Sequence, residues 1–190
     1  MKIDILKVGM LETNCYVVSN GEKAVIIDPG ADAEKIAEFI DSKKLSVEYI
    51  LLTHTHFDHI GVLAAVKEKT GAKIAVGEAD KEAIKLPADL LLRGGESINA
   101  ASLDFRVLNT PGHTRGGVCY IFGDVIFSGD TLFCESIGRS DLPGGSFDEL
   151  RVSLKRLFKL DGDFTVYPGH GDSTTLSHER QYNPFKDAIK

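Results

Sequence analysis

Short apolar runs separated by turn residues recur along the whole chain. Such runs predict strands over residues 3–8, 15–19 and 24–27, and Asn20-Gly21 is a two-residue hairpin signal between the last two. A helix is expected over 33–43, with Asp32 placed to cap it. After an apolar strand at 49–52, a second helix is predicted over 60–70.

The second half of the chain repeats this alternation. A short helix and a loop containing Pro87 are expected between residues 78 and 93, and Ser146 and Glu149 form a capping box that opens a helix ending near residue 158. Further strands are predicted at 73–76, 102–109, 117–122, 125–128 and 164–167, and a last helix at 176–183. This order fits two packed sheets with helices outside, in a single α/β domain over residues 1–190.

Composition narrows the functional classes. The chain has 190 residues and a formal net charge of −6, and Lys and Arg form no basic run, which argues against nucleic-acid binding. No apolar stretch approaches the ~20 residues that span a bilayer, and Asp4 and Lys7 interrupt any secretory segment. We therefore expect a soluble cytoplasmic protein. The three cysteines, Cys15, Cys119 and Cys134, suit neither a disulfide framework nor a zinc clip.

The densest chemical signal is the stretch Thr53-His54-Thr55-His56-Phe57-Asp58-His59, directly after the apolar strand 49–52. Because side chains alternate along a strand, His54 and His56 should emerge on the same side of the backbone. A polar loop with incidental histidines is the alternative. Three imidazoles and a carboxylate in six residues are far denser than a solvated loop needs, so the stretch predicts a metal site.

Three further candidates follow apolar strands, each directly after a glycine: His113, Asp130 and His170. Functional residues gather in such strand-end loops. Each of them alone could be an ordinary core or surface residue. Together with the first stretch they give seven candidate ligands, too many for one tetrahedral zinc ion, and this surplus indicates two metal ions.

The whole set resembles the metallo-β-lactamase superfamily, and its finer features resemble glyoxalase II, the hydroxyacylglutathione hydrolase. The resemblance rests on His54-x-His56-x-Asp58-His59 and on the segments 110–114, 129–133, 136–145 and 168–171. It implies a four-layer αββα sandwich. It also implies that His54, His56 and His113 bind one metal ion, that Asp58, His59 and His170 bind the second, and that Asp130 bridges them.

The expected chemistry is hydrolysis of a small thioester by a hydroxide shared between two divalent metal ions. Asp58 is the candidate catalytic residue beside that hydroxide. Zinc is the first expectation for the metal, with iron or manganese as alternatives. Asp28 and Thr53 are placed to orient the metal ligands by contacting them without binding the metal themselves. The alternative is that they are simply a turn residue and a strand terminus. Arg139 lies either at the substrate rim or in a structural salt bridge.

Two features depart from the glyoxalase II pattern. The chain ends shortly after Pro184, where longer glyoxalase II enzymes continue into a helical glutathione-binding domain, so no such domain is expected here. Arg115 stands where many relatives carry a proline. It either alters the pocket rim or is an ordinary surface residue.

Alternative functions within the same fold remain open. A mononuclear iron persulfide dioxygenase needs only two histidines and a carboxylate, which ligands such as His56 with His113 and Asp130 would supply. A non-catalytic, metal-stabilised binding module is a third reading. Hydrolysis of β-lactams and RNA cleavage rank lower. The expected partner is a small thioester such as an S-acylglutathione, without nucleic acid or membrane, and the sequence does not fix the oligomeric state.

Overall fold

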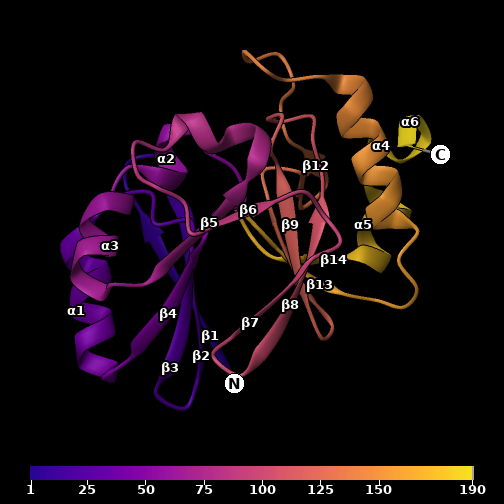
Figure 1. Ribbon diagram of the computed structural model, residues 1–190. Coiled ribbons are helices and arrows are strands. Elements are labelled where there is room, and N and C mark those ends of the chain that lie inside the picture. The colour runs from indigo at the N-terminus through magenta and orange to yellow at the C-terminus, as the bar shows by residue number, and fades with distance from the viewer. Residues whose placement is uncertain (190) are drawn as a thin grey trace.

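The computed structural model describes residues 1–189. Two six-stranded sheets lie face to face, with helices on both outer surfaces (Figure 1). The first sheet has the order β1-β2-β3-β4-β5-β6, in which β1 to β3 run antiparallel and β3 to β6 run parallel. Its strands are β1 (Lys2–Val8), β2 (Thr13–Asn20), β3 (Lys23–Ile27), β4 (Ser46–Leu51), β5 (Lys73–Gly77) and β6 (Leu90–Leu92).

The second sheet has the order β14-β13-β10-β9-β8-β7, with a parallel pair only between β10 and β13. Its strands are β7 (Ser97–Ala100), β8 (Leu103–Asn109), β9 (Val118–Phe122), β10 (Val125–Gly129), β13 (Thr165–Pro168) and β14 (Thr174–Thr175). A small hairpin, β11 (Leu132–Phe133) with β12 (Ser136–Ile137), follows β10.

The helices complete the outer layers. In Figure 1, α1 and α3 cover the first sheet, and α4, α5 and α6 cover the second. The helices are α1 (Ala33–Lys43), α2 (Phe57–Ile60), α3 (Leu63–Thr70), α4 (Phe147–Phe158), α5 (Leu176–Tyr182) and α6 (Lys186–Ile189), with a 3-10 helix η1 (Glu78–Ala83). This is the αββα sandwich that the resemblance implied.

Three apolar layers hold the sandwich together. The central layer lies between the sheets and includes Tyr16, Phe105 and Phe127, all nearly inaccessible to solvent. A second layer joins the first sheet to α1 and α3, and a third joins the second sheet to α4, α5 and α6. Burying three such layers removes most apolar side chains from water, which is the main force that stabilises the fold.

Most predicted elements are present, with some corrections. The helix expected over 60–70 begins only at Leu63 as α3, after the separate short helix α2, which ends at Ile60. The two-residue hairpin loop is Gly21-Glu22 because Asn20 already pairs with Lys23. Asp32 occupies the N-cap position of α1, but its side chain accepts the Gly9 N–H at 2.9 Å instead of capping the helix. The Ser146 cap is confirmed, since its side chain accepts the Glu149 N–H.

Seven short elements were not predicted: α2, β6, β7, β11, β12, β14 and α6. Each has no more than four residues, too few for periodicity to appear in the sequence. Within residues 1–189, the helices are all too short or too polar to cross a membrane.

Candidate metal centre

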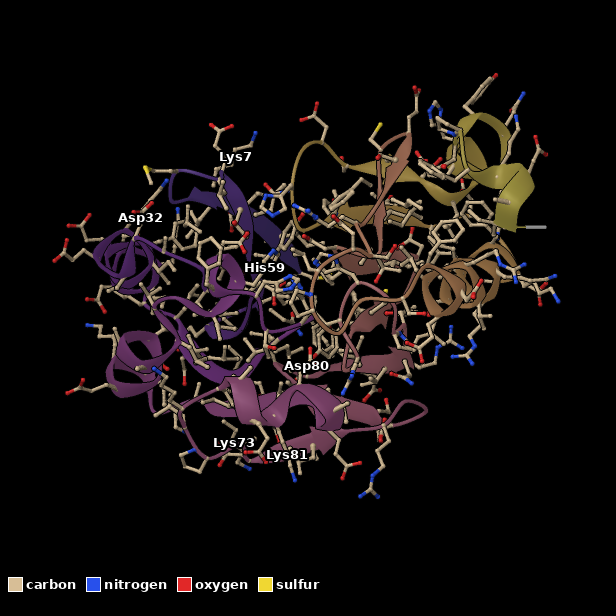
Figure 2. The ribbon with its side chains drawn as sticks, turned by 90° about the horizontal axis from the view of Figure 1, so that it is seen from above. Lys7, Asp32, His59, Lys73, Asp80 and Lys81 are labelled. Atoms are coloured by element: carbon tan, nitrogen blue, oxygen red, sulfur yellow. The ribbon has the colours of Figure 1, made fainter. Side chains whose placement is uncertain are left out.

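Loops from both sheets meet at one edge of the sandwich. The loop after β4 carries His54 and His56, and the helix α2 that follows carries Asp58 and His59. The second sheet contributes His113 after β8, Asp130 after β10 and His170 after β13. Viewed onto this edge, His59 lies between the two halves of the molecule (Figure 2). The structure therefore brings all seven predicted ligand residues together.

The first group of possible metal ligands is His54, His56 and His113, whose nitrogens lie within 4.8 Å of one another. His56 Nδ1 is 2.8 Å from His113 Nε2. The rings of His54 and His113 have their centroids 4.8 Å apart and stand nearly perpendicular. The three rings thus turn toward a common point, as the ligands of a single ion do.

The second group is Asp58, His59 and His170. Asp58 Oδ2 lies 3.1 Å from His170 Nε2 and 3.5 Å from His59 Nε2, and the two imidazole nitrogens are 3.3 Å apart. The Thr13 hydroxyl donates to the same Asp58 oxygen at 3.1 Å and fixes the carboxylate.

Asp130 lies between the two groups. Its Oδ1 is 3.3 Å from His59 Nε2, and its Oδ2 is 3.4 Å from His113 Nε2 and 3.7 Å from His170 Nε2. One carboxylate therefore faces histidines of both groups, as a bridging ligand would.

The hydrogen bonds of the histidines test whether this donor set fits a metal. In four of them Nδ1 meets a protein oxygen: His54 meets Thr53 Oγ1 at 3.1 Å, His59 meets Asp28 Oδ2 at 2.9 Å, His113 meets the Arg139 carbonyl at 2.7 Å and His170 meets the Leu11 carbonyl at 3.1 Å. In the neutral ring, an acceptor at Nδ1 keeps the proton on that nitrogen, so that Nε2 presents its lone pair to a metal ion. The donor set fits.

Two buried atoms support the same conclusion. His54 Nε2 and Asp130 Oδ1 have no hydrogen-bond partner within the described residues. A buried polar atom without a partner costs about 1–3 kcal/mol. Coordination of a metal ion would satisfy both atoms.

Asp28 and Thr53 lie behind the histidines. Asp28 accepts the Thr53 N–H at 2.8 Å and its hydroxyl at 2.5 Å, besides contacting His59. Asp28 holds a left-handed backbone with φ of 53°, which costs a non-glycine residue free energy and is frequent at functional sites. The two hydrogen bonds from Thr53 thus fix the orientation of the carboxylate that contacts His59.

The site's charges are strongly coupled. Burial alone would lower the pKa of His59, but the neighbouring carboxylates of Asp130 and Asp28 outweigh burial and raise this pKa to about 10. Burial acts to raise the pKa of Asp58, but the hydrogen bond from His170 and the charge of His59 hold this pKa well below its usual range. The metal-free site therefore holds a proton on His59, which a bound cation would displace.

Close backbone approach is required at Gly169. A Cβ atom at this position would lie 2.1 Å from Asp130 Oδ1 and 2.6 Å from His59 Cε1. Any larger residue would intrude on the ligand cluster.

The remaining candidate residues lie around this centre. Arg139 donates twice to Asp141, at 2.8 Å each, so its exposed side chain forms the salt bridge that was the alternative to a rim role. Arg115 lines a hollow beside His56. Cys134 is exposed at the tip of the β11–β12 hairpin, near His178 and Glu179 rather than among the seven ligands.

Besides Thr13, two residues that support the site escaped prediction. Asn14 donates to the carbonyls of Pro168 and Gly171 at 3.0 and 2.9 Å, and Tyr16 donates to the Pro168 carbonyl at 2.5 Å. Both lie on β2 and hold the loop that carries His170. An amide at the start of an otherwise apolar strand was the only signal for Asn14.

Comparison with known proteins agrees with this geometry. The family profile of the metallo-β-lactamase superfamily matches residues 8–170. The chain is 34% identical to hydroxyacylglutathione hydrolase GloC of Haemophilus influenzae, over 97% of this chain and 98% of GloC.

Two solved structures are also close. The B3 metallo-β-lactamase BLEG-1 superposes with a TM-score of 0.91 at 35% identity, over 97% of this chain and 99% of BLEG-1. TTHA1623, solved in a di-iron-bound form, gives a TM-score of 0.88 at 36% identity, over 96% of this chain and 99% of TTHA1623. The chain belongs to the metallo-β-lactamase superfamily.

Proposed function

We propose that this protein is a metal-dependent hydrolase of small thioesters of the S-acylglutathione type. The observation that carries the proposal is the pair of three-residue groups with Asp130 between them. His54, His56 and His113 would hold one ion, Asp58, His59 and His170 the other, and Asp130 both. The likeness to a relative named hydroxyacylglutathione hydrolase supports this substrate class.

Two such ions, zinc first and iron or manganese as alternatives, would lower the pKa of a bound water and polarise the carbonyl that it attacks. The residues of the chain contribute by holding and orienting. Asp28 fixes the His59 ring through Nδ1, Thr13 fixes Asp58, and the Arg139 carbonyl fixes His113. Asp58, beside the attacking water, would accept its hydrogen bond. A thiolate leaves readily, so the site needs no strong general acid.

Activity and metal content of matched variants test the proposal. Wild-type protein is expected to hold about two metal ions and to hydrolyse S-lactoylglutathione. Asp130→Ala should lose both metal and activity, the latter by more than about 100-fold. Asp124→Ala, directly before the opposite end of strand β10, should retain both. Robust hydrolysis of S-lactoylglutathione by metal-free protein would refute the proposal.

β-Lactam hydrolysis is a second candidate, because the likeness to BLEG-1 favours it. A chromogenic cephalosporin offered to the same zinc-loaded protein separates the two reactions. The persulfide dioxygenase alternative predicts instead that iron-loaded protein consumes oxygen when glutathione persulfide is added. The thioester proposal expects kcat/KM for S-lactoylglutathione to exceed the values for both other substrates.

A further inference from the structure

A hollow of about 500 Å³ opens beside the candidate metal centre, within the size range of small-molecule sites. His56 forms part of its wall, and the rest comes from η1, from the residues after His113 and from the loop before α4. Its charged side chains are Asp80, Glu82 and Arg115. A group attached to a substrate held at His56 would extend into this hollow.

Arg115 is the cation of the hollow, and it is unpaired. Within residues 1–189 its guanidinium makes no hydrogen bond or ion pair. The other arginine near the centre, Arg139, is neutralised by Asp141 through two hydrogen bonds of 2.8 Å. Of the two guanidinium groups, only that of Arg115 has its donors available for a ligand.

The position of Arg115 is defined by its neighbours. It is two residues from His113, whose ring is fixed by the Arg139 carbonyl, and the next residue, Gly116, donates its N–H to Asp80 at 2.7 Å. The stem of Arg115 crosses Gly144, where its Cγ lies 3.8 Å from the place of a Cβ. A guanidinium placed on a fixed backbone loses less entropy when it binds a ligand.

The two carboxylates of the hollow limit the ligand's charge. Asp80 is buried, and its Oδ2 has no hydrogen-bond partner within the described residues, while Glu82 is exposed at the rim. Both would repel a highly charged anion. A single carboxylate that forms two hydrogen bonds to Arg115 fits this balance better than a phosphate does.

We propose that Arg115 binds a carboxylate carried by the substrate and so makes the enzyme selective for carboxylate-bearing thioesters. The inference rests on the proposed thioesterase function for its substrate class. Arg115 is thus a specificity-determining residue that contacts the substrate away from the reacting carbonyl. It replaces Arg139 as the cation of the substrate rim.

A binding measurement tests this without depending on hydrolysis. The probes are 3-(ethylthio)propanoate and its amide, thioethers that cannot be cleaved, titrated into zinc-loaded protein and followed by the NMR signals of the arginine Nε–H groups. Wild type should bind the carboxylate about tenfold more tightly than the amide, the factor expected of one charge-assisted pair. The Arg115 signal should shift with the carboxylate.

Variants separate Arg115 from a general charge effect and from carboxylate binding to the metal. Arg115→Met should abolish the tenfold preference, Arg115→Lys should retain part of it, and Arg139→Gln should retain all of it. A preference that survives in Arg115→Met, or that is absent in wild type, overturns the inference. Failure of wild type to cleave any thioester, with the Arg115 preference intact, would instead refute the proposed reaction and leave the carboxylate site standing.

Discussion

Asp28 Oδ2 lies 2.9 Å from His59 Nδ1, and both side chains are almost completely buried. The same carboxylate is held by the N–H and the hydroxyl of Thr53. The relationship fixes which nitrogen of His59 faces the ligand cluster. It also connects the end of β3 to the stretch that follows β4.

Replacing Asp28 by Asn should therefore weaken metal binding without removing a ligand. The amide is a poorer acceptor for Nδ1–H and lacks the negative charge, so we expect about a 10- to 100-fold loss of zinc affinity. Competition with a chelator measures it. Asp32→Asn is the control, because Asp32 shares the left-handed backbone but its carboxylate accepts the Gly9 N–H and does not contact a ligand histidine within residues 1–189. Equal zinc affinities in Asp28→Asn and wild type would show that Asp28 does not tune the site.

A methyl group at position 169 should disturb the metal site by steric clash alone. In Gly169→Ala the new Cβ would approach Asp130 Oδ1 to 2.1 Å, so Asp130 or His59 must move. We expect at least about a tenfold loss of zinc affinity, since mutations of residues that position the metal ligands have effects of this size. In the control Gly123→Ala the Cβ meets open space, although its φ of 54° is strained. That variant should lose about 1 kcal/mol of stability but keep its zinc affinity. If both variants bind zinc equally well, the close approach at Gly169 has no functional role.

Thiol reactivity should distinguish the three cysteines. Burial raises the pKa of the Cys119 thiol to about 11 and that of Cys15 further, whereas Cys134 is exposed. At pH 8 a colorimetric disulfide reagent should label one thiol per native chain rapidly and three in denaturant. Cys134→Ser should show no rapid labelling. Rapid labelling of two thiols in the native protein would contradict this packing.

The sequence predicts the ligand cluster well because its information is local. His54, His113, Asp130 and His170 each follow an apolar strand, and strand ends converge at sheet edges. The assembly of these ends into one cluster follows once the two sheets face each other. The separation into two groups came from the family resemblance, not from periodicity.

The groups that orient the ligands are harder to predict from the sequence. Asn14 and Tyr16 hold the His170 loop across more than 150 residues of chain, and no local pattern encodes such a contact. The acceptors for His113 and His170 are backbone carbonyls, which every residue possesses. The pairing of Arg139 with Asp141, which leaves Arg115 as the available cation, likewise depends on tertiary placement.

Titration of metal-free protein with zinc, with thioester hydrolysis followed at each addition, tests the central claim most directly. If His54, His56 and His113 hold one ion and Asp58, His59 and His170 another, activity should rise until about two equivalents have bound and then stay constant. Elemental analysis of the saturated protein should give the same stoichiometry. Full activity in the metal-free protein, or a plateau at one equivalent with no second ion bound, would contradict the two-metal account.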